Sequence, residues 1–140
     1  MSEQVGYFTL LYVSDATASA GAIASIARQS RMRNRREDIT GLLIFDGACF
    51  AQLVEGPKKA LVSLVERLEV DPRHERMEVL SFSHSGIKRR FPNWLLGYLL
   101  VDDEGMGVRN LRSKVGADAL SSFEALLPHV DADLDGLANA

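Results

Sequence analysis

An apolar stripe with helical spacing constrains the fold of this 140-residue chain more than any other feature. Its members are separated by i, i+3, i+4 and i+7, and a proline shortly before them favours the first turn of a helix. A helix with one apolar face must bury that face against a second layer of structure. The sequence therefore predicts a packed helix that begins at Pro57 and buries Leu61, Leu64, Val65 and Leu68.

The runs on either side of this helix predict that the second layer is a sheet. β-prone, largely apolar runs predict strands at residues 7–14, 42–45, 49–55, 79–85 and 96–102. Apolar residues at helical spacing predict another helix over residues 18–30, and Asp46-Gly47 favours a hairpin turn. Two strand-helix-strand units with a hairpin between them predict an α+β fold. We expect a ferredoxin-like βαββαβ sheet with one additional strand and both helices on one face.

The chain after the acidic break at residues 102–105 predicts two short C-terminal helices. These helices are expected to cover the sheet face that the first two helices leave bare. We therefore expect a sheet domain at residues 1–104, a helical extension packed on the sheet at 105–130, and a polar tail at 131–140. The apolar positions of the extension are Val108, Leu111, Val115, Leu120, Phe123, Leu126 and Leu127.

Composition indicates a globular protein that stays in the cytoplasm. Hydrophobic residues make up 46% of the chain and charged residues 25%, which is ordinary for this class. No apolar run approaches the roughly 18 residues that span a bilayer, and the N-terminus lacks the basic and apolar regions of a signal peptide. Cys49 has no second cysteine with which to form a disulfide or share a metal, so we expect a core residue and no metal site.

Arginines gather between residues 28 and 36, although the net charge of the chain is -3. They could close the first helix and continue into a solvated loop, because cations meet the negative end of a helix dipole favourably. They could instead contact a phosphate-bearing ligand. Nucleic acid is the least expected partner, because no aromatic residues are interleaved among the arginines. The cluster is Arg28, Arg31, Arg33, Arg35 and Arg36, and Lys88-Arg89-Arg90 form a second one.

Gln52 stands between Phe50 and Val54 on one face of a predicted strand, where an amide is unusual. A buried side-chain amide without partners costs on the order of 1–3 kcal/mol, so a polar group must face it. The hydroxyl of Tyr12 could meet this need, although a tyrosine in an apolar strand is by itself most simply a core residue. An amide offers both an acceptor and a donor group, so rotation or tautomerisation would make Gln52 a two-state hydrogen-bond element.

Two further polar motifs are weak by themselves. Asn34 is expected in a loop, where its amide could pair with an adjacent carbonyl and N–H of a ligand. Asp71-Pro72-Arg73-His74 follows the second helix and on its own indicates a helix-to-strand turn. Within a site, Arg73 and His74 could donate to a ligand carbonyl, with Asp71 orienting them.

The order of these motifs along the chain is specific. They are Leu10-Leu11-Tyr12-Val13-Ser14, Asn34 ahead of Ile39-Thr40-Gly41, Phe50-Ala51-Gln52-Leu53-Val54-Glu55-Gly56, Asp71-Pro72-Arg73-His74 and Arg90-Phe91-Pro92-Asn93-Trp94. This series resembles the BLUF family, the blue-light receptors that bind FAD, over residues 6–102. The resemblance implies a flavin ring between the two helices, with FAD as the cofactor and FMN or riboflavin as alternatives. The phosphate-bearing ligand of the arginines would then be the FAD diphosphate.

The resemblance also implies a role for each residue. In BLUF proteins, blue light excites the bound flavin, a tyrosine passes it an electron and a proton, and a glutamine mediates the transfer and rearranges. By this resemblance Tyr12 is the donor, Gln52 is the switch, and Trp94 with Leu96 forms the signal relay. Leu96 stands where family members often carry methionine. The implied flavin-binding residues are Tyr12, Ile26, Ser30, Asn34, Gln52, Asp71, Arg73 and His74, with Leu61 or Val65 as further neighbours.

The expected function is therefore that of a blue-light photoreceptor of the short, single-domain type, and not of an enzyme. Residues 1–104 would be the flavin-binding photosensor, and the signal is expected to pass through self-association or an unidentified partner protein. Two other functions remain open, a colourless ferredoxin-like regulatory domain that binds a ligand and a small enzyme acting on phosphorylated compounds. The sequence contains neither the Walker loop nor the Gly-x-Gly-x-x-Gly pattern, and a yellow protein would favour the sensor.

Overall fold

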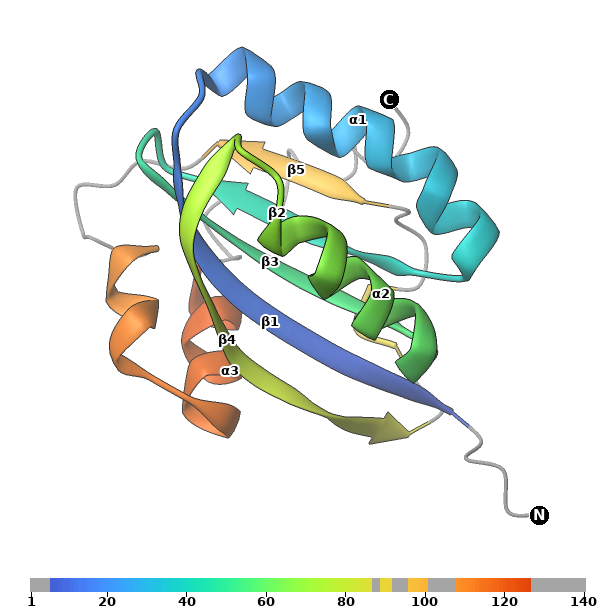
Figure 1. Ribbon diagram of the computed structural model, residues 1–140. Helices are drawn as coiled ribbons and strands as arrows, with labels where there is room; N and C mark the ends of the chain where they lie inside the picture. The colour runs from blue at the N-terminus through green and yellow to red at the C-terminus, as the bar shows by residue number, and fades with distance from the viewer. Residues whose placement is uncertain (1–5, 87–88, 92–95, 101–107, 127–140) are drawn as a thin grey trace.

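The apolar stripe of the central helix packs on a five-stranded sheet, as the sequence predicts. Figure 1 shows the computed structural model, which describes residues 6–86, 89–91, 96–100 and 108–126. Two α-helices lie on one face of the sheet, and a 3-10 helix and a third α-helix lie on the other (Figure 1). The sheet thus separates two apolar cores, one under each layer of helices.

The strands confirm the predicted ferredoxin-like topology. They lie in the order β4-β1-β3-β2-β5, in which the first four form an antiparallel sheet and β5 pairs in parallel with β2 as the additional strand. β1 and β3 pair at the centre of the sheet and lie under α2 (Lys58–Glu69), whereas α1 (Ala20–Glu37) lies over β2 and β5 (Figure 1). The strands are β1 (Tyr7–Ala16), β2 (Thr40–Phe45), β3 (Cys49–Gly56), β4 (His74–Gly86) and β5 (Gly97–Leu100).

The hairpin between β2 and β3 forms where it is predicted. The carboxylate of Asp46 accepts hydrogen bonds from the backbone N–H groups of Ala48 and Cys49 at 2.9 and 2.8 Å, and Gly47 adopts a φ of 98° that favours glycine. Within β2, a Cβ added to Gly41 would lie 2.1 Å from the carbonyl oxygen of Leu53. Glycine at position 41 therefore allows the two strands to approach closely.

The first helix is longer than predicted. α1 runs from Ala20 to Glu37, with Ser19 accepting a hydrogen bond from the Ala22 N–H at 3.2 Å, and not only over residues 18–30. The helix therefore includes residues expected in a loop, namely Arg33, Asn34, Arg35 and Arg36. The prediction stopped early because the buried side of the last turns is carried by a polar residue, so the apolar periodicity ends before the helix does.

The second helix, α2 (Lys58–Glu69), begins one residue after the predicted start at Pro57, which is its N-cap, and buries Leu61 and Leu64. β4 begins at His74, several residues before the predicted start at 79. Residues 75–78 are mostly polar because β4 is an edge strand and carries a bulge against β1 at this point, so alternation does not identify them. As a result, His74 is a strand residue.

The C-terminal elements cover the other face of the sheet, as expected. The two short helices predicted there are η2 (Arg109–Ser113), a 3-10 helix, and α3 (Gly116–Ala125), an α-helix. Leu111 and Phe123 are almost completely buried in the core beneath them, together with Leu11 and Val13 of β1. Trp94, Pro128 and the tail at residues 131–140 lie outside the described residues.

Candidate functional site

Tyr12 and Gln52 form the centre of the candidate site. They are direct partners in the pairing of β1 with β3, and both side chains are almost completely buried. The hydroxyl of Tyr12 donates a hydrogen bond to Oε1 of Gln52, with an oxygen-to-oxygen distance of 2.5 Å. The polar group that the sequence requires opposite Gln52 is therefore Tyr12.

His74 joins this pair through the neighbouring strands. Its Nδ1 lies 2.5 Å from Oγ of Ser14, which is two residues after Tyr12 and therefore on the same face of β1. The Ser14 hydroxyl donates to the backbone carbonyl of Glu75 at 3.0 Å. The His74 tautomer that satisfies both Ser14 contacts carries its proton on Nδ1, which then donates to Ser14 Oγ while the hydroxyl proton goes to the Glu75 carbonyl. The neutral ring then presents Nε2 as an acceptor.

Three rings enclose one side of the site. The ring of His74 lies 5.3 Å from that of Phe50 and 6.4 Å from that of Tyr12, measured between centroids. Nε2 of His74 is buried and has no hydrogen-bond partner among the described residues, although the nearby Leu68 carbonyl raises the pKa of the ring. A buried polar atom without a partner is costly in a finished core, so this nitrogen suits a ligand that brings its own donor.

Burial sets the protonation of both titratable groups. It raises the pKa of the Tyr12 hydroxyl far above its ordinary value, and the negative charge of Asp71 raises it further. Burial also lowers the pKa of His74, with the positive charge of Arg73 adding to the effect and Asp71 opposing it. At neutral pH, Tyr12 is therefore protonated and His74 is neutral.

Asp71 and Arg73 form a two-pronged ion pair in the turn before β4. Nε and Nη2 of Arg73 lie 2.9 and 2.7 Å from the two carboxylate oxygens, and the backbone N–H of Arg73 donates to Oδ1 of Asp71 at 2.9 Å. The hydrogen bond from Arg73 keeps the pKa of the Asp71 carboxyl below its usual value. Asp71 therefore orients Arg73, as the sequence suggests, whereas Ser14 orients His74.

The predicted residues of α1 share one side of the helix. Ser30 follows Ile26, and Asn34 follows Ser30, at i+4 spacing, which aligns their side chains along the helix. Ile26 and Ser30 are half-buried, and Asn34 is 2% exposed. A buried amide on a stripe of small and apolar residues is the second feature that suits a polar ligand edge.

The remaining predicted neighbours also lie on this side of the sheet. Leu61 of α2 belongs to the same apolar core as Tyr12, and Val65 packs against that core, which also contains Leu96, the predicted relay residue just before β5. The structure thus brings Tyr12 and Gln52 into direct contact and places the ring of His74 beside them, where it is hydrogen-bonded to Ser14. It surrounds them with the predicted apolar residues of α1 and α2.

Two arginines that could bind a ligand are used within the fold. The side chain of Arg89 is 7% exposed and donates to Thr40 Oγ1 at 2.8 Å and to the Asp38 carbonyl at 2.7 Å. Its guanidinium also stacks 3.8 Å from the ring centroid of Tyr7. Nε of Arg31 donates to the Leu96 carbonyl at 3.0 Å. Arg89 therefore serves a structural role.

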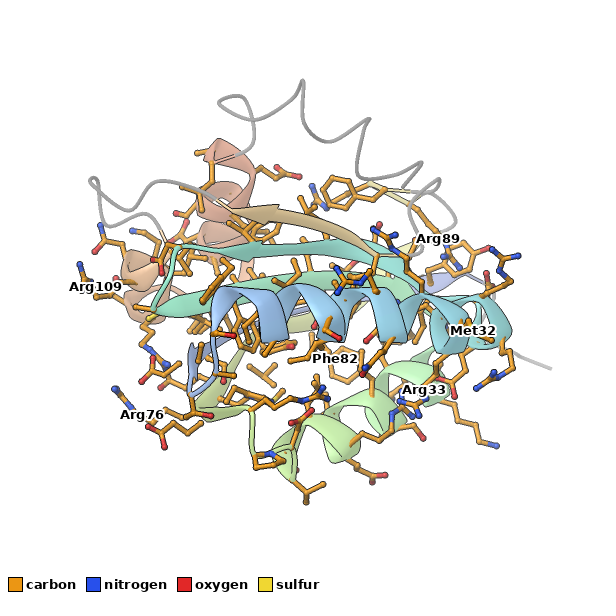
Figure 2. The ribbon with its side chains drawn as sticks, turned by 90° about the horizontal axis from the view of Figure 1, so that it is seen from above. Met32, Arg33, Arg76, Phe82, Arg89 and Arg109 are labelled. Carbon is orange, nitrogen blue, oxygen red and sulfur yellow. The ribbon has the colours of Figure 1, made fainter. Side chains whose placement is uncertain are left out.

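Other arginines of α1 are exposed. Arg28, Arg33, Arg35 and Arg36 are all exposed on the helix, although the sequence predicted a loop for the last three. In Figure 2, Arg33 projects from α1 on the side of α2, at the same end of the molecule as Arg89. Arg33 is therefore an arginine of α1 whose side chain points toward the space beside α2.

Sequence reasoning missed one residue of the site, Ser14, and one buried anchor on the opposite face of β3, Glu55. Ser14 was identified as part of a motif and on the same face as Tyr12, but its contact with His74 depends on the register between β1 and β4. Glu55 is completely buried on β3, and its carboxylate accepts hydrogen bonds from the backbone N–H groups of Arg90 and Phe91 at 2.8 and 3.1 Å. A carboxylate inside an otherwise apolar strand is the signal that could have identified Glu55.

Comparisons with known proteins agree with the resemblance seen in the sequence. Residues 7–97 match the model of the BLUF family, described as sensors of blue-light using FAD. The chain is similar to the dark-state structure of BlrB, a BLUF protein, with 29% identity and a TM-score of 0.63, covering 91% of this chain and 83% of that one. None of the helices in the described segments combines the length and apolarity that crossing a membrane requires.

Curated relatives include much longer proteins. The chain is 41% identical over 68 residues to the photoactivated adenylate cyclase subunit beta of Euglena gracilis, a match that covers 47% of this chain and 8% of that protein. It is 35% identical over 57 residues to the blue light- and temperature-regulated antirepressor BluF of Escherichia coli, covering 41% of this chain and 14% of that protein. The chain therefore spans only a small part of the length of these relatives.

Proposed function

This chain belongs to the BLUF family of flavin-binding blue-light sensors, and on that premise we propose that Tyr12 and Gln52 form its photochemical pair. The observation that carries the proposal is their buried hydrogen bond, in which Tyr12 donates to Oε1 of Gln52 at 2.5 Å. The domain is a sensor and not an enzyme, and the cyclase activity named for the Euglena relative belongs to that protein.

The hydrogen bond fixes the direction in which a proton can move. A bound flavin would supply the absorption of blue light and an acceptor for one electron. Tyr12 keeps its proton in the dark because burial raises the pKa of the hydroxyl. Once Tyr12 loses an electron its hydroxyl becomes strongly acidic, and Oε1 of Gln52 is the neighbouring atom that can take the proton. A rearranged Gln52 amide would then leave an altered hydrogen-bond pattern after the proton returns to Tyr12.

The predicted flavin-binding residues suit a flavin ring between α1 and α2. The amide of Asn34 would pair with a carbonyl and the adjacent N–H of the ring, while Ile26 and Ser30, with Leu61 or Val65, would enclose it. Arg73, held by Asp71, would donate to a second carbonyl. We expect these contacts to orient the ring and to exclude water from the Tyr12 hydroxyl.

His74 would take a different role from the donor role expected from the sequence. Its Nδ1–H is directed at Ser14, so Nε2 of the neutral ring is an acceptor that needs a donor from the ligand. A hydroxyl group of the flavin side chain has the required chemistry. The pKa of His74, lowered by burial, supports acceptance over donation at neutral pH.

FAD is the flavin that we propose for this chain. The family description names FAD, and Arg33 offers a cation on the side of α1 that is turned toward α2. A guanidinium pairs well with a diphosphate, which riboflavin lacks. Because the ring contacts are common to FAD, FMN and riboflavin, such phosphate contacts would supply the preference.

Reconstitution tests both parts of this proposal. Flavin-free protein is mixed with FAD, FMN or riboflavin, and binding, thermal unfolding and the spectrum under blue light are measured. We expect all three to bind and to give a reversible red shift, with FAD the tightest. At a concentration of one hundred times its dissociation constant, a flavin should stabilise the fold by about 2.7 kcal/mol.

A matched pair of variants isolates the phosphate contact. Arg33→Gln should weaken FAD and leave riboflavin unchanged, whereas Arg28→Gln, on an earlier turn of α1, should affect neither. If no flavin binds or protects the wild-type protein, the ring site is wrong. If FAD and riboflavin bind equally in the wild type and in both variants, only the preference for FAD is wrong.

The output is proposed to pass to a partner protein. Relatives carry names that link blue light to a cyclase and to an antirepressor. We propose that residues 1–104 sense light and that the extension at 105–130, whose described residues 108–126 pack on the far face of the sheet, carries the signal outward, with self-association as a second route. The cytoplasmic location stays a prediction. Capture of partners in light and in darkness, together with light scattering, tests these routes.

A further inference from the structure

The strand that carries His74 is irregular immediately after it. Val13 of β1 pairs with Glu78 of β4, but Asp15 pairs with Glu75, so one residue of β1 faces two residues of β4. This is a β-bulge, and Arg76 within it adopts a φ of 57°, which is uncommon for a residue other than glycine. The geometry of the bulge determines how His74 is presented to the site.

Ser14 holds the bulge from the inner face of the sheet, which is the face covered by α1 and α2; the outer face is the one covered by η2 and α3. The Ser14 hydroxyl donates to the Glu75 carbonyl at 3.0 Å and lies 2.5 Å from Nδ1 of His74. Ser14 is completely buried, and His74 is 7% exposed. Movement of the Glu75 backbone would therefore be transmitted through Ser14 to the imidazole of His74.

The same bulge is held from the outer face by Arg112 of η2. Nη1 of Arg112 donates to the Arg76 carbonyl at 2.9 Å and to Glu78 Oε1 at 2.7 Å, and Nη2 donates to Asp15 Oδ1 at 2.7 Å. The second carboxylate oxygen of Asp15 accepts from Nη1 of Arg76 at 2.9 Å. Although Asp15 is 97 positions before Arg112, the two are joined by a short charge-assisted hydrogen bond.

The charged states of Asp15 and Arg112 favour the contact between them. Burial opposes ionisation of Asp15, but the hydrogen bonds from Arg112 and Cys49 outweigh it and lower the pKa of the carboxyl. The Arg112 side chain is only 16% exposed, so water competes little for its donors. In Figure 2, Arg76 and Arg109 of η2 lie at the same end of the molecule, which is the end where this contact is made.

We propose that Arg112 is a positioning residue for the flavin site, because it fixes from the outer face the β4 bulge that presents His74 on the inner face. Coupling of this kind is reciprocal, so a light-driven change at His74 also changes the hold of β4 on η2. The inference rests on the proposed function only for its light-dependent half. Its structural half, the coupling of Arg112 to His74, holds with or without flavin.

Two variants and a matched control test the coupling in the full chain. Arg112→Gln removes the charge and the three-way contact, and Arg112→Lys keeps the charge but not the forked geometry. Arg90→Gln is the control, because Arg90 pairs with Glu124 of α3 and so also ties the C-terminal extension to the sheet, away from the bulge. Thermal unfolding establishes that each variant is folded, and the lysine variant serves if the glutamine variant is not.

The first readout is the nitrogen NMR spectrum of the His74 ring in flavin-free protein. Both Arg112 variants should shift the Nδ1 and Nε2 signals, and Arg90→Gln should leave them unchanged. Unchanged His74 signals in folded Arg112 variants would overturn the proposal, as would equal shifts in the Arg90 control. Neither result depends on whether the protein responds to light.

The second readout is dark recovery of the red shift with flavin bound. Arg112→Gln loses three hydrogen bonds, two of them to carboxylates, so we expect the recovery rate to change about tenfold or more. A double-mutant cycle with Ser14→Ala should be non-additive, since both residues act on the same bulge. Additive effects, or recovery equal to that of the wild type, would overturn the light-dependent half. A wild-type protein without any red shift would instead count against the proposed function.

Discussion

Gln52 and Glu55 stand on opposite faces of β3 and connect it to different parts of the molecule. Gln52 accepts the hydrogen bond from Tyr12 on the side of α1 and α2. Glu55 accepts the N–H groups of Arg90 and Phe91, and Phe91 belongs to the core beneath η2 and α3. One central strand therefore carries the proposed switch on one face and an anchor for the C-terminal side on the other.

Tyr12→Phe should retain flavin and lose the red shift. Phenylalanine preserves the buried ring and its edge-to-face contact with Phe50, at 6.0 Å between centroids, but removes the oxidisable hydroxyl. Oε1 of Gln52 then loses its donor, so the fold should be destabilised by about 1–2 kcal/mol. Absorbance before and after blue light tests the first effect and urea unfolding the second. A normal, reversible red shift in this variant would exclude Tyr12 as the donor.

Gln52→Leu should also keep the cofactor and abolish the red shift. Leucine has similar bulk and suits the apolar surroundings of a residue that is 4% exposed, but it has no amide to rearrange. The Tyr12 hydroxyl loses its acceptor, so its infrared or NMR signal should move even in darkness. A reversible red shift of normal size would exclude Gln52 as the switch, whereas loss of bound flavin would show that Gln52 also holds the ring.

The sequence predicted those parts of the fold whose pattern is local and periodic. α2 and the central strands carry clear apolar periods, and the order of strands follows from two strand-helix-strand units. The last turns of α1 were missed because Asn34 fills the buried position that an apolar residue usually occupies. The start of β4 was missed because an edge strand with a bulge does not alternate.

The residues of the candidate site also fall into those that the sequence could predict and those that it could not. Gln52 on a buried strand face required a polar partner, and alternation put Tyr12 and Ser14 on one side of β1. The contact of Ser14 with His74 depends on the register across a bulge, and that of Asp15 with Arg112 joins residues 97 positions apart. Such long-range contacts leave no periodic signal in one sequence.

Stability should fall as the pH drops below about 6.5, the ordinary pKa of histidine. Burial lowers the pKa of His74 in the folded protein, so between the folded and unfolded pKa values the unfolded chain binds more protons. The unfolding free energy therefore decreases with acidification across this window. Urea titrations from pH 7.5 to about pH 5 test this expectation. His74→Gln should have a shallower slope, and an equal slope would assign the effect to another group.

Gly41→Ala should strongly destabilise the protein. A Cβ at this position would lie 2.1 Å from the Leu53 carbonyl oxygen and 2.9 Å from Cα of Val54, both backbone atoms of the paired strand. Relief requires separation of β2 from β3, so a loss of more than about 3 kcal/mol is expected. Gly21→Ala is the control, because on α1 the nearest atom is 3.9 Å away and alanine favours a helix. Similar melting temperatures for the two variants would contradict this account.

Replacement of Glu55 should loosen the chain between β4 and β5 in a graded way. Its carboxylate is completely buried and accepts from two backbone N–H groups, those of Arg90 and Phe91. Glu55→Gln keeps one acceptor oxygen but loses the charge, so we expect a cost of about 1–2 kcal/mol. Glu55→Ala leaves both N–H groups without an acceptor and should cost more, about 3 kcal/mol or above.

Urea unfolding measures the total effect of these variants, and hydrogen exchange at Arg90 and Phe91 locates it. Exchange at both amides should accelerate in the order wild type, glutamine, alanine, because the anchor protects these two groups directly. The Tyr12–Gln52 hydrogen bond lies on the other face of β3, so the dark flavin spectrum should stay unchanged. Equal exchange in all three proteins would show that Glu55 does not hold this segment, whatever the loss of stability.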